Sequence, residues 1–141
     1  PNNLMPYIAQ VATGKLASLN IFGNDYNTHD GTGVRDYIHV MDIANGHLSA
    51  LNFILKKNGW HVINLGSGKG FSVLEVLKAF EIVSGKTIPY NVNKRRSGDI
   101  AICFAEVNKA KQNLNWGASR SLIEMCSSVW KFQSLILKKS L

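Results

Sequence analysis

The chain has 141 residues, a length typical of a single domain, and 45% of them are hydrophobic, which is enough to supply a core. No apolar run approaches the roughly 20 residues of a membrane-spanning helix, so no membrane partner is expected. The net charge of +7 is uneven: residues 1–55 carry two basic and four acidic side chains, and residues 56–141 carry fourteen and five. A basic half suits nucleic acid, a charged surface or an anionic small molecule. Most lysines are scattered as on solvated helix faces, and only residues 94–96 form a cluster.

The cysteines and histidines predict no metal centre. Cys103 and Cys126 do not make a disulfide framework, and neither they nor the four histidines stand in a metal-ligand spacing. A reducing, cytoplasmic compartment is therefore expected. Because the chain begins with Pro1 rather than methionine, we interpret it as a fragment or processed piece of a longer protein.

Helical and strand patterns alternate along the chain and predict one α/β unit. The first helix is expected over residues 3–13, with Asn3 as its N-cap. Ser72 and Glu75 have the spacing of a capping box that opens a later helix, which Gly85 ends. The remaining elements, in order, are a strand at 19–22, a loop at 24–33, a strand at 37–40, a helix at 42–55, a strand at 61–65, a turn at 66–70, a helix at 73–84, a strand at 88–92, and helices at 106–114 and 121–137.

Two motifs resemble parts of nucleotide-binding enzymes but fail on inspection. Residues 66–72 follow a predicted strand and open a helix, yet Phe71 stands where a dinucleotide loop needs a small residue. We interpret this segment as a structural turn. Tyr90 and Lys94 match Tyr-x-x-x-Lys, the pattern of the catalytic pair in short-chain dehydrogenases. The two side chains of that pair must share one helical face, whereas this stretch has a strand pattern.

One group of residues suits an anionic ligand that carries a ring. Phe22 closes a strand at a glycine, where its ring can stack on a base. Arg35 and Arg96 can grip phosphate oxygens with two hydrogen bonds each, and Asp99 can bind ribose hydroxyls. From residue types alone, an alternative stays open, in which Arg35 pairs with a local aspartate and residues 96–99 form a solvated turn.

Several motifs, in this order along the chain, closely resemble UDP-glucose 4-epimerases. They are Pro1-Asn2-Asn3-Leu4-Met5-Pro6-Tyr7, Phe22-Gly23-Asn24-Asp25-Tyr26, Asp30-Gly31-Thr32-Gly33-Val34-Arg35-Asp36-Tyr37-Ile38-His39-Val40, Asn64-Leu65-Gly66, Arg95-Arg96-Ser97-Gly98-Asp99 and Leu114-Asn115-Trp116. The resemblance covers nearly the whole chain and thins after about residue 133.

The resemblance implies an α/β fold of the extended short-chain dehydrogenase type. In that family an N-terminal Rossmann domain holds NAD and a C-terminal lobe holds the UDP-sugar. Residues 1–141 resemble only that lobe, with most of the Rossmann core missing. The family's glycine-rich loop, catalytic Ser or Thr and true Tyr-x-x-x-Lys pair are expected upstream, so we predict no catalytic, cofactor-binding or metal-binding residue in this chain. The complete enzyme is expected to be a homodimer.

The resemblance also assigns contacts with the UDP-sugar. These are Asn3 and Leu4 for the diphosphate; Asn20, Ile21 and Phe22 for the uracil; Arg35 and Arg96 for the diphosphate; and Asp99 for the ribose. Ser97 stands where the family usually carries Glu, a change that should matter little because Arg96 and Asp99 remain. Cys103 falls where family members carry either a large Tyr or a smaller residue beside the sugar. Because a smaller residue leaves room at the sugar's C2 substituent, we expect UDP-GlcNAc and UDP-GalNAc to be accepted as well.

The sequence therefore predicts the UDP-hexose-binding part of an NAD-dependent UDP-glucose 4-epimerase of galactose metabolism, inactive by itself. Two alternatives remain. One is another sugar-nucleotide dehydratase, decarboxylase or epimerase of the same superfamily. The other is a non-enzymatic basic module that binds nucleic acid or an anionic surface. Only residues 94–96 support the second alternative, and no nucleic-acid-binding motif accompanies them, so no nucleic-acid partner is expected.

Overall fold

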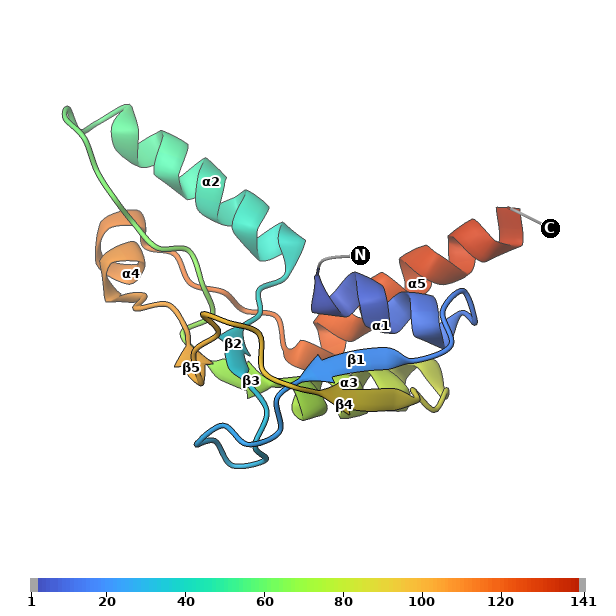
Figure 1. Ribbon diagram of the computed structural model, residues 1–141. Coiled ribbons are helices and arrows are strands. Elements are labelled where there is room, and N and C mark those ends of the chain that lie inside the picture. Colours follow the sequence, from blue (N-terminus) through green and yellow to red (C-terminus); the bar gives the residue numbers. More distant parts are fainter. Residues whose placement is uncertain (1–2, 140–141) are drawn as a thin grey trace.

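The computed structural model describes residues 3–139, with side chains described as far as residue 136, so Pro1 and Asn2 of the first motif lie outside it. Helices and strands alternate, as predicted for an α/β fold (Figure 1). In chain order the elements are α1 (Leu4–Ala12), β1 (Leu19–Phe22), β2 (Val34–Asp36), α2 (Val40–Ile54), β3 (Gly70–Ser72), α3 (Val73–Ser84), β4 (Tyr90–Asn93), β5 (Ile102–Cys103), α4 (Asn108–Leu114) and α5 (Leu122–Lys139).

The strands form two small sheets that bring distant segments together. β1 pairs in parallel with β4, and Phe22 lies opposite Asn93. In the second sheet β2 lies in the middle, antiparallel to β3 and parallel to β5, with Arg35 opposite Cys103. The segment between β4 and β5 therefore passes from the end of one sheet to the other, which carries residues 94–99 past the ends of β1 and β2.

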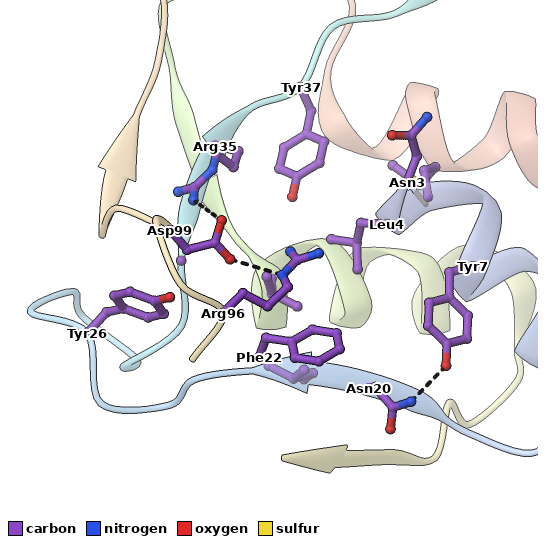
Figure 2. Close-up of a pocket in the computed structure, with 14 residues that line it drawn as sticks. Asn3, Leu4, Tyr7, Asn20, Phe22, Tyr26, Arg35, Tyr37, Arg96 and Asp99 are labelled. Atoms are coloured by element: carbon purple, nitrogen blue, oxygen red, sulfur yellow. Dashed lines mark hydrogen bonds and ion pairs between the residues drawn. The ribbon is translucent and has the colours of Figure 1, made fainter. Parts of the chain in front are cut away.

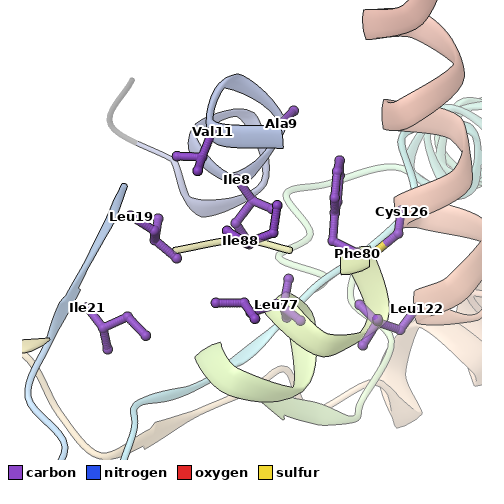
Figure 3. Packing of buried hydrophobic residues seen from close by; sticks show 12 residues of the cluster. Ile8, Ala9, Val11, Leu19, Ile21, Leu77, Phe80, Ile88, Leu122 and Cys126 are labelled. Carbon is purple, nitrogen blue, oxygen red and sulfur yellow. The ribbon is translucent and has the colours of Figure 1, made fainter. Parts of the chain in front are cut away.

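The main core lies between α1, α3, α5 and the β1–β4 sheet (Figure 3). Its buried side chains are Ile8, Ala9, Val11, Leu19, Ile21, Val76, Leu77, Ala79, Phe80, Ile88, Leu122 and Cys126. A smaller cluster around Ala110, Leu114 and Trp116 packs beneath α2 and α4. Figure 1 shows α2 and α4 standing away from the three helices of the main core.

A pair of side chains fixes where α3 begins. Ser72 accepts a hydrogen bond from the Glu75 amide (3.1 Å) and the Glu75 carboxylate accepts one from the Ser72 amide (2.7 Å), which confirms the capping box. Gly85 ends α3 in the left-handed region, at φ 64°, as predicted. Asn3 occupies the N-cap position of α1, but its side chain makes no capping hydrogen bond, so that part of the prediction is wrong.

The expected strand at 37–40 is wrong, because the strand in this region is β2, which ends at Asp36. The Asp36 carboxylate accepts backbone hydrogen bonds from Ser67, Gly68 and Ala105, which tie the end of β2 to two other segments. Three residues later the His39 ring accepts a hydrogen bond from the Met41 amide (3.0 Å) and caps α2. Val40 is consequently helical, and α2 begins two residues earlier than expected.

Residues 61–65 also differ from the prediction, because they form no strand. No strand of the described region pairs with them, and an alternating pattern cannot form a ladder without a neighbour. β1 and α3 have their predicted bounds, and the bounds of the remaining elements shift by a few residues. β4 begins after Pro89, which has no amide hydrogen to donate, and Gly70 joins β3 rather than the preceding turn. The two-residue β5 was not predicted.

Candidate functional site

A cavity of about 640 Å³ opens between the start of α1, the end of β1, β2 and the segment after β4 (Figure 2). Every predicted contact residue except Cys103 lines it. The lining residues are Asn3, Leu4, Met5, Tyr7, Asn20, Ile21, Phe22, Tyr26, Gly33, Arg35, Tyr37, Val73, Arg96 and Asp99. The cavity thus combines aromatic rings, two guanidinium groups and one carboxylate.

Asp99 links the two arginines of the cavity. Its Oδ2 atom lies 3.1 Å from Arg96 Nε, and its Oδ1 atom lies 3.8 Å from Arg35 Nη2. Arg35 is also held by its own strand, because Nη1 donates to the Val34 carbonyl at 2.8 Å. Two cations share one carboxylate, so a net positive charge remains, which favours an anionic ligand. The alternative of Arg35 paired with an aspartate adjacent in sequence is not observed.

Phe22 and Arg96 meet at the end of β1. The guanidinium carbon of Arg96 lies 4.7 Å from the centre of the Phe22 ring, within the range of a cation–π contact. A glycine follows Phe22 in a left-handed conformation, φ 87° for Gly23, so the chain turns sharply away there. The ring therefore remains half-buried at the wall of the cavity rather than inside the core.

The far end of the cavity is lined by α1 and β1. Asn20 Nδ2 donates a hydrogen bond to the Tyr7 hydroxyl at 3.2 Å, which joins the two elements. Asn3 and Leu4 bring the N-terminus of α1 to the cavity. The Asn3 side chain does not cap the helix and the first turn of α1 holds no acidic residue, so the positive end of the helix dipole adds to the arginine charge.

The side chains that line the cavity are suited to binding an anion. Burial raises the pKa of Tyr37 to about 12, although the Arg35 charge lowers it, so this phenol stays protonated and is no general base. The lining contains no histidine, cysteine or serine, and hence no nucleophile with its base. Within the described residues, no group of three or more His, Cys, Asp or Glu could hold a metal ion.

Backbone amides of the turn at 66–70 donate hydrogen bonds to a carboxylate of the same chain. The amides of Ser67 and Gly68 donate to the Asp36 carboxylate at 3.0 and 3.1 Å, and the Ser67 hydroxyl donates to it as well. A side chain at Gly66 would lie 2.6 Å from that carboxylate. These amides bind an internal anion where a phosphate loop would bind a ligand, which confirms the interpretation of a structural turn.

Two of the three side chains in the basic cluster at 94–96 pair with carboxylates. Arg95 Nε lies 2.7 Å from Asp25 Oδ1, and its guanidinium carbon lies 4.1 Å from the centre of the Tyr26 ring. The hydrogen bond from Arg95 is the largest influence on the pKa of Asp25, which lies below its ordinary value. Because Arg96 is engaged by Asp99 and Phe22, the cluster is no free basic patch.

The model of a family described as GDP-mannose 4,6 dehydratase matches residues 1–129. The chain belongs to this family. It is accordingly placed in the extended short-chain dehydrogenase superfamily, as the sequence motifs imply. None of the helices in the described part of the chain has both the length and the apolarity needed to cross a bilayer.

Similar members of this family carry the name UDP-glucose 4-epimerase. The protein of that name from Bacillus subtilis is 61% identical over 134 residues, 95% of this chain and 40% of the relative. The Stenotrophomonas maltophila epimerase, solved with bound NAD and formylated UDP-arabinopyranose, is 49% identical with a TM-score of 0.95 over 99% of this chain and 41% of its own. The Bifidobacterium longum epimerase, solved with NAD+ and UDP, is 49% identical with a TM-score of 0.91 and coverages of 96% and 40%. The chain spans about 40% of the length of the relatives it matches.

Cys103 is the one predicted contact that lies outside the cavity lining. It is an exposed free thiol on β5, opposite Arg35 in the parallel β2–β5 pair. Three tyrosines that do line the cavity, Tyr7, Tyr26 and Tyr37, received no role from the sequence. The sequence places Tyr7 on the apolar face of the first helix. Tyr26 and Tyr37 lie in motifs from which we predict contacts only for the phenylalanine and the arginine.

Proposed function

We propose that this chain is the UDP-sugar-binding lobe of an NAD-dependent UDP-glucose 4-epimerase. The observation that carries the proposal is the convergence of Phe22, Arg35, Arg96 and Asp99 on one cavity from three separate segments. An aromatic face suits the uracil, a carboxylate suits the ribose hydroxyls, and cations suit the diphosphate. The cavity offers these three kinds of group side by side. Relatives that are epimerases, at up to 61% identity, support the same substrate class.

In this proposal the lobe anchors one end of the substrate. Arg35 and Arg96 bind the diphosphate, Asp99 accepts hydrogen bonds from the ribose hydroxyls, and the uracil lies along Asn20, Ile21 and Phe22. Charge-assisted bonds from guanidinium groups are the strongest of these contacts. Because the UDP end carries most of the affinity, the hexose is free to reorient while the nucleotide stays fixed, as a reaction on both faces of one sugar carbon requires.

The described residues do not fit NAD. A dinucleotide site needs free backbone amides at a glycine-rich turn, and those of Ser67 and Gly68 are bound to Asp36. We therefore assign NAD and the residues that do the chemistry to the part of the complete protein that this chain does not contain. The lobe by itself is expected to bind UDP-sugars and not to turn them over.

The apolar surface of α2 supports a second domain in the complete protein. Leu48, Leu51 and Leu55 are exposed at helical spacing, and Trp60 beyond the helix is 88% exposed. Val62 is also exposed in the unpaired segment that alternates like a strand. We propose that the Rossmann domain covers this face and that residues 61–65 pair with one of its strands. Exposed apolar patches of this kind otherwise favour aggregation.

The decisive experiment measures UDP binding and turnover separately. Isothermal titration calorimetry of the chain should detect UDP binding, with cytosine and guanine nucleotides as controls. The complete enzyme should interconvert UDP-glucose and UDP-galactose, and the chain alone should not. Salt-sensitive DNA binding without UDP binding would favour the basic-module alternative. A complete protein that binds UDP-galactose without epimerising it would favour another enzyme of the superfamily.

The tolerance of N-acetylated sugars is proposed to depend on Cys103. The thiol at this position of β5, opposite Arg35, is much smaller than a phenol ring. In the complete enzyme, Cys103→Tyr should abolish activity on UDP-GlcNAc and preserve activity on UDP-glucose. Cys103→Ala is the matched control and should keep both activities. Unchanged N-acetyl activity in the tyrosine variant would refute the assignment.

Assembly and location complete the proposal. The family resemblance favours a homodimer of the complete enzyme, and light scattering coupled to gel filtration tests it. An exposed free thiol at Cys103 and a buried one at Cys126 suit a reducing, cytoplasmic compartment. Cell fractionation followed by immunodetection checks the location.

A further inference from the structure

The Tyr26 hydroxyl has an unusual position in this structure. Tyr26 is only 6% exposed, and its oxygen is the one buried side-chain nitrogen or oxygen in the described residues without a hydrogen-bond partner. The residue lines the cavity, and in Figure 2 its hydroxyl points to the side where Arg96 and Asp99 lie. A buried hydroxyl without a partner is unfavourable, so such groups in proteins call for an explanation.

The ring that carries this hydroxyl is closely packed against Arg95 and Gly23. The Arg95 guanidinium stacks 4.1 Å from its centre, and Arg95 is itself anchored by Asp25. Gly23 packs against the ring so closely that a Cβ atom there would lie 2.6 Å from Tyr26 Cε2 and 2.8 Å from Arg95 Cγ. The packing of the ring therefore fixes the position of the hydroxyl oxygen.

The charged groups that line the cavity are two arginines and one aspartate, and they pair with one another. Asp99, the carboxylate of the cavity, is shared between Arg35 and Arg96, and no hydrogen bond joins it to Tyr26. The Tyr26 hydroxyl lines the same cavity as the guanidinium groups of Arg35 and Arg96. An anionic oxygen attracted by those two cations would be a suitable acceptor for its hydrogen bond.

We propose that the Tyr26 hydroxyl donates a hydrogen bond to a diphosphate oxygen of the bound nucleotide, and that Arg95 positions its ring for this contact. The inference rests on the proposed UDP-sugar binding and adds a ligand-contacting residue to it. It assigns different tasks to adjacent arginines: Arg96 contacts the ligand directly, whereas Arg95 acts through Tyr26. The ligand would supply the hydrogen-bond partner that the described residues do not give to the Tyr26 hydroxyl.

The test is Tyr26→Phe, which removes the hydroxyl and keeps the ring under Arg95. Titration calorimetry with UDP should show affinity weakened about tenfold or more, because the lost bond goes to a charged group. Thermal unfolding without UDP should show an unchanged or higher midpoint, since an unpartnered buried hydroxyl is removed. Tyr90→Phe, on exposed β4 outside the cavity, is the matched control and should leave both values unchanged.

Each outcome decides between specific alternatives. Unchanged UDP affinity with a lowered unfolding midpoint would overturn the inference and assign the hydroxyl to an internal water. An equal loss of affinity for uridine would overturn the diphosphate assignment, since uridine has no phosphate. Absence of UDP binding in the wild-type chain would overturn the proposed function and this inference together. Arg95→Ala should weaken UDP binding much less in the Tyr26→Phe background than in the wild type, and additive losses would refute the positioning role.

Discussion

The Arg96 guanidinium carbon lies 4.7 Å from the centre of the Phe22 ring, although three strands and two helices, β2 to β4, lie between these residues in sequence. This contact joins the proposed base site and the proposed diphosphate site in one pair of side chains. In the empty cavity Arg96 shields one face of the ring, while its Nε atom is held by Asp99. A nucleotide must therefore stack on the ring and bind the guanidinium together, which couples recognition of the base to recognition of the phosphates.

Replacing Phe22 should separate these two contributions. Phe22→Ala is expected to weaken UDP binding roughly tenfold or more, because stacking of one base on an aromatic ring contributes about 1–3 kcal/mol. Pyrophosphate, which has no base, should lose less affinity than UDP in competition titrations. Phe132→Ala, at an exposed position of α5, should bind UDP like the wild type. Equal losses for UDP and pyrophosphate would mean that the ring serves only to hold Arg96.

Arg96 should be replaceable neither by alanine nor by lysine. Arg96→Lys keeps the charge but loses the planar fork that binds phosphate with two hydrogen bonds, so UDP affinity should fall roughly tenfold. Arg96→Ala should bind more weakly still and should show a smaller dependence on salt, because one cation is gone. Calorimetry at two sodium chloride concentrations measures both effects. Lys94→Ala controls for nearby positive charge, and a loss as large as that of Arg96→Ala would contradict a specific phosphate contact.

Much of this site follows from the sequence because its residues lie at the ends of well-defined elements. The strand at Leu19–Phe22 has its predicted bounds, and Phe22 and Arg35 stand where a strand meets a glycine. Their place in the cavity lining agrees with the expectation that side chains at such positions are accessible to a ligand. The pairing of Arg35 with Asp99, by contrast, depends on how the segment after β4 crosses between two sheets. No local sequence pattern predicts the path of that segment.

The wrong predictions share a physical cause, which is that short strands are defined by their partners. β5 has two residues and becomes a strand only because β2 lies beside it. Residues 61–65 alternate like a strand but have no partner in the described region, whereas residues 37–39 alternate and instead lead into a helix that His39 caps. Tyr26 was missed for a related reason, since only its distant contact with Arg95 places its ring at the cavity.

The start of α3 provides a test of local stability. Ser72 is fully buried, caps the helix and donates a hydrogen bond to Asp30, so Ser72→Ala removes a cap and one hydrogen bond to a carboxylate. We expect a loss of about 1–2 kcal/mol in the free energy of unfolding, measured with urea. Ser121→Ala removes an exposed capping partner of Glu124 and should cost less. Equal losses would show that the bond to Asp30 contributes nothing.

We expect the Asp42 carboxylate to influence how far the pH can fall before the protein unfolds. Its carboxylate is 2% exposed and accepts hydrogen bonds from the amides of Ser119 and Arg120 and from the Arg120 side chain. Burial by itself would raise the pKa of Asp42, but these bonds and the Arg120 charge outweigh it, so the pKa lies below the ordinary 3.8. A carboxyl with a lowered folded-state pKa stabilises the protein above the ordinary value, and this stabilisation disappears as the pH falls through the folded-state pKa.

Asp42→Asn therefore tests whether this one carboxylate ties α2 to the segment before α5. At neutral pH the variant should be less stable by about 2 kcal/mol, because it leaves Arg120 without its anion. Below about pH 4 the difference from the wild type should shrink, since protonation removes the same interaction from the wild type. Asp25→Asn is the control: its pKa is also lowered, but the side chain is exposed, and the acid-unfolding midpoint should stay close to that of the wild type. Circular dichroism against pH measures both, and a difference that persists undiminished at low pH would refute the role of the Asp42 charge.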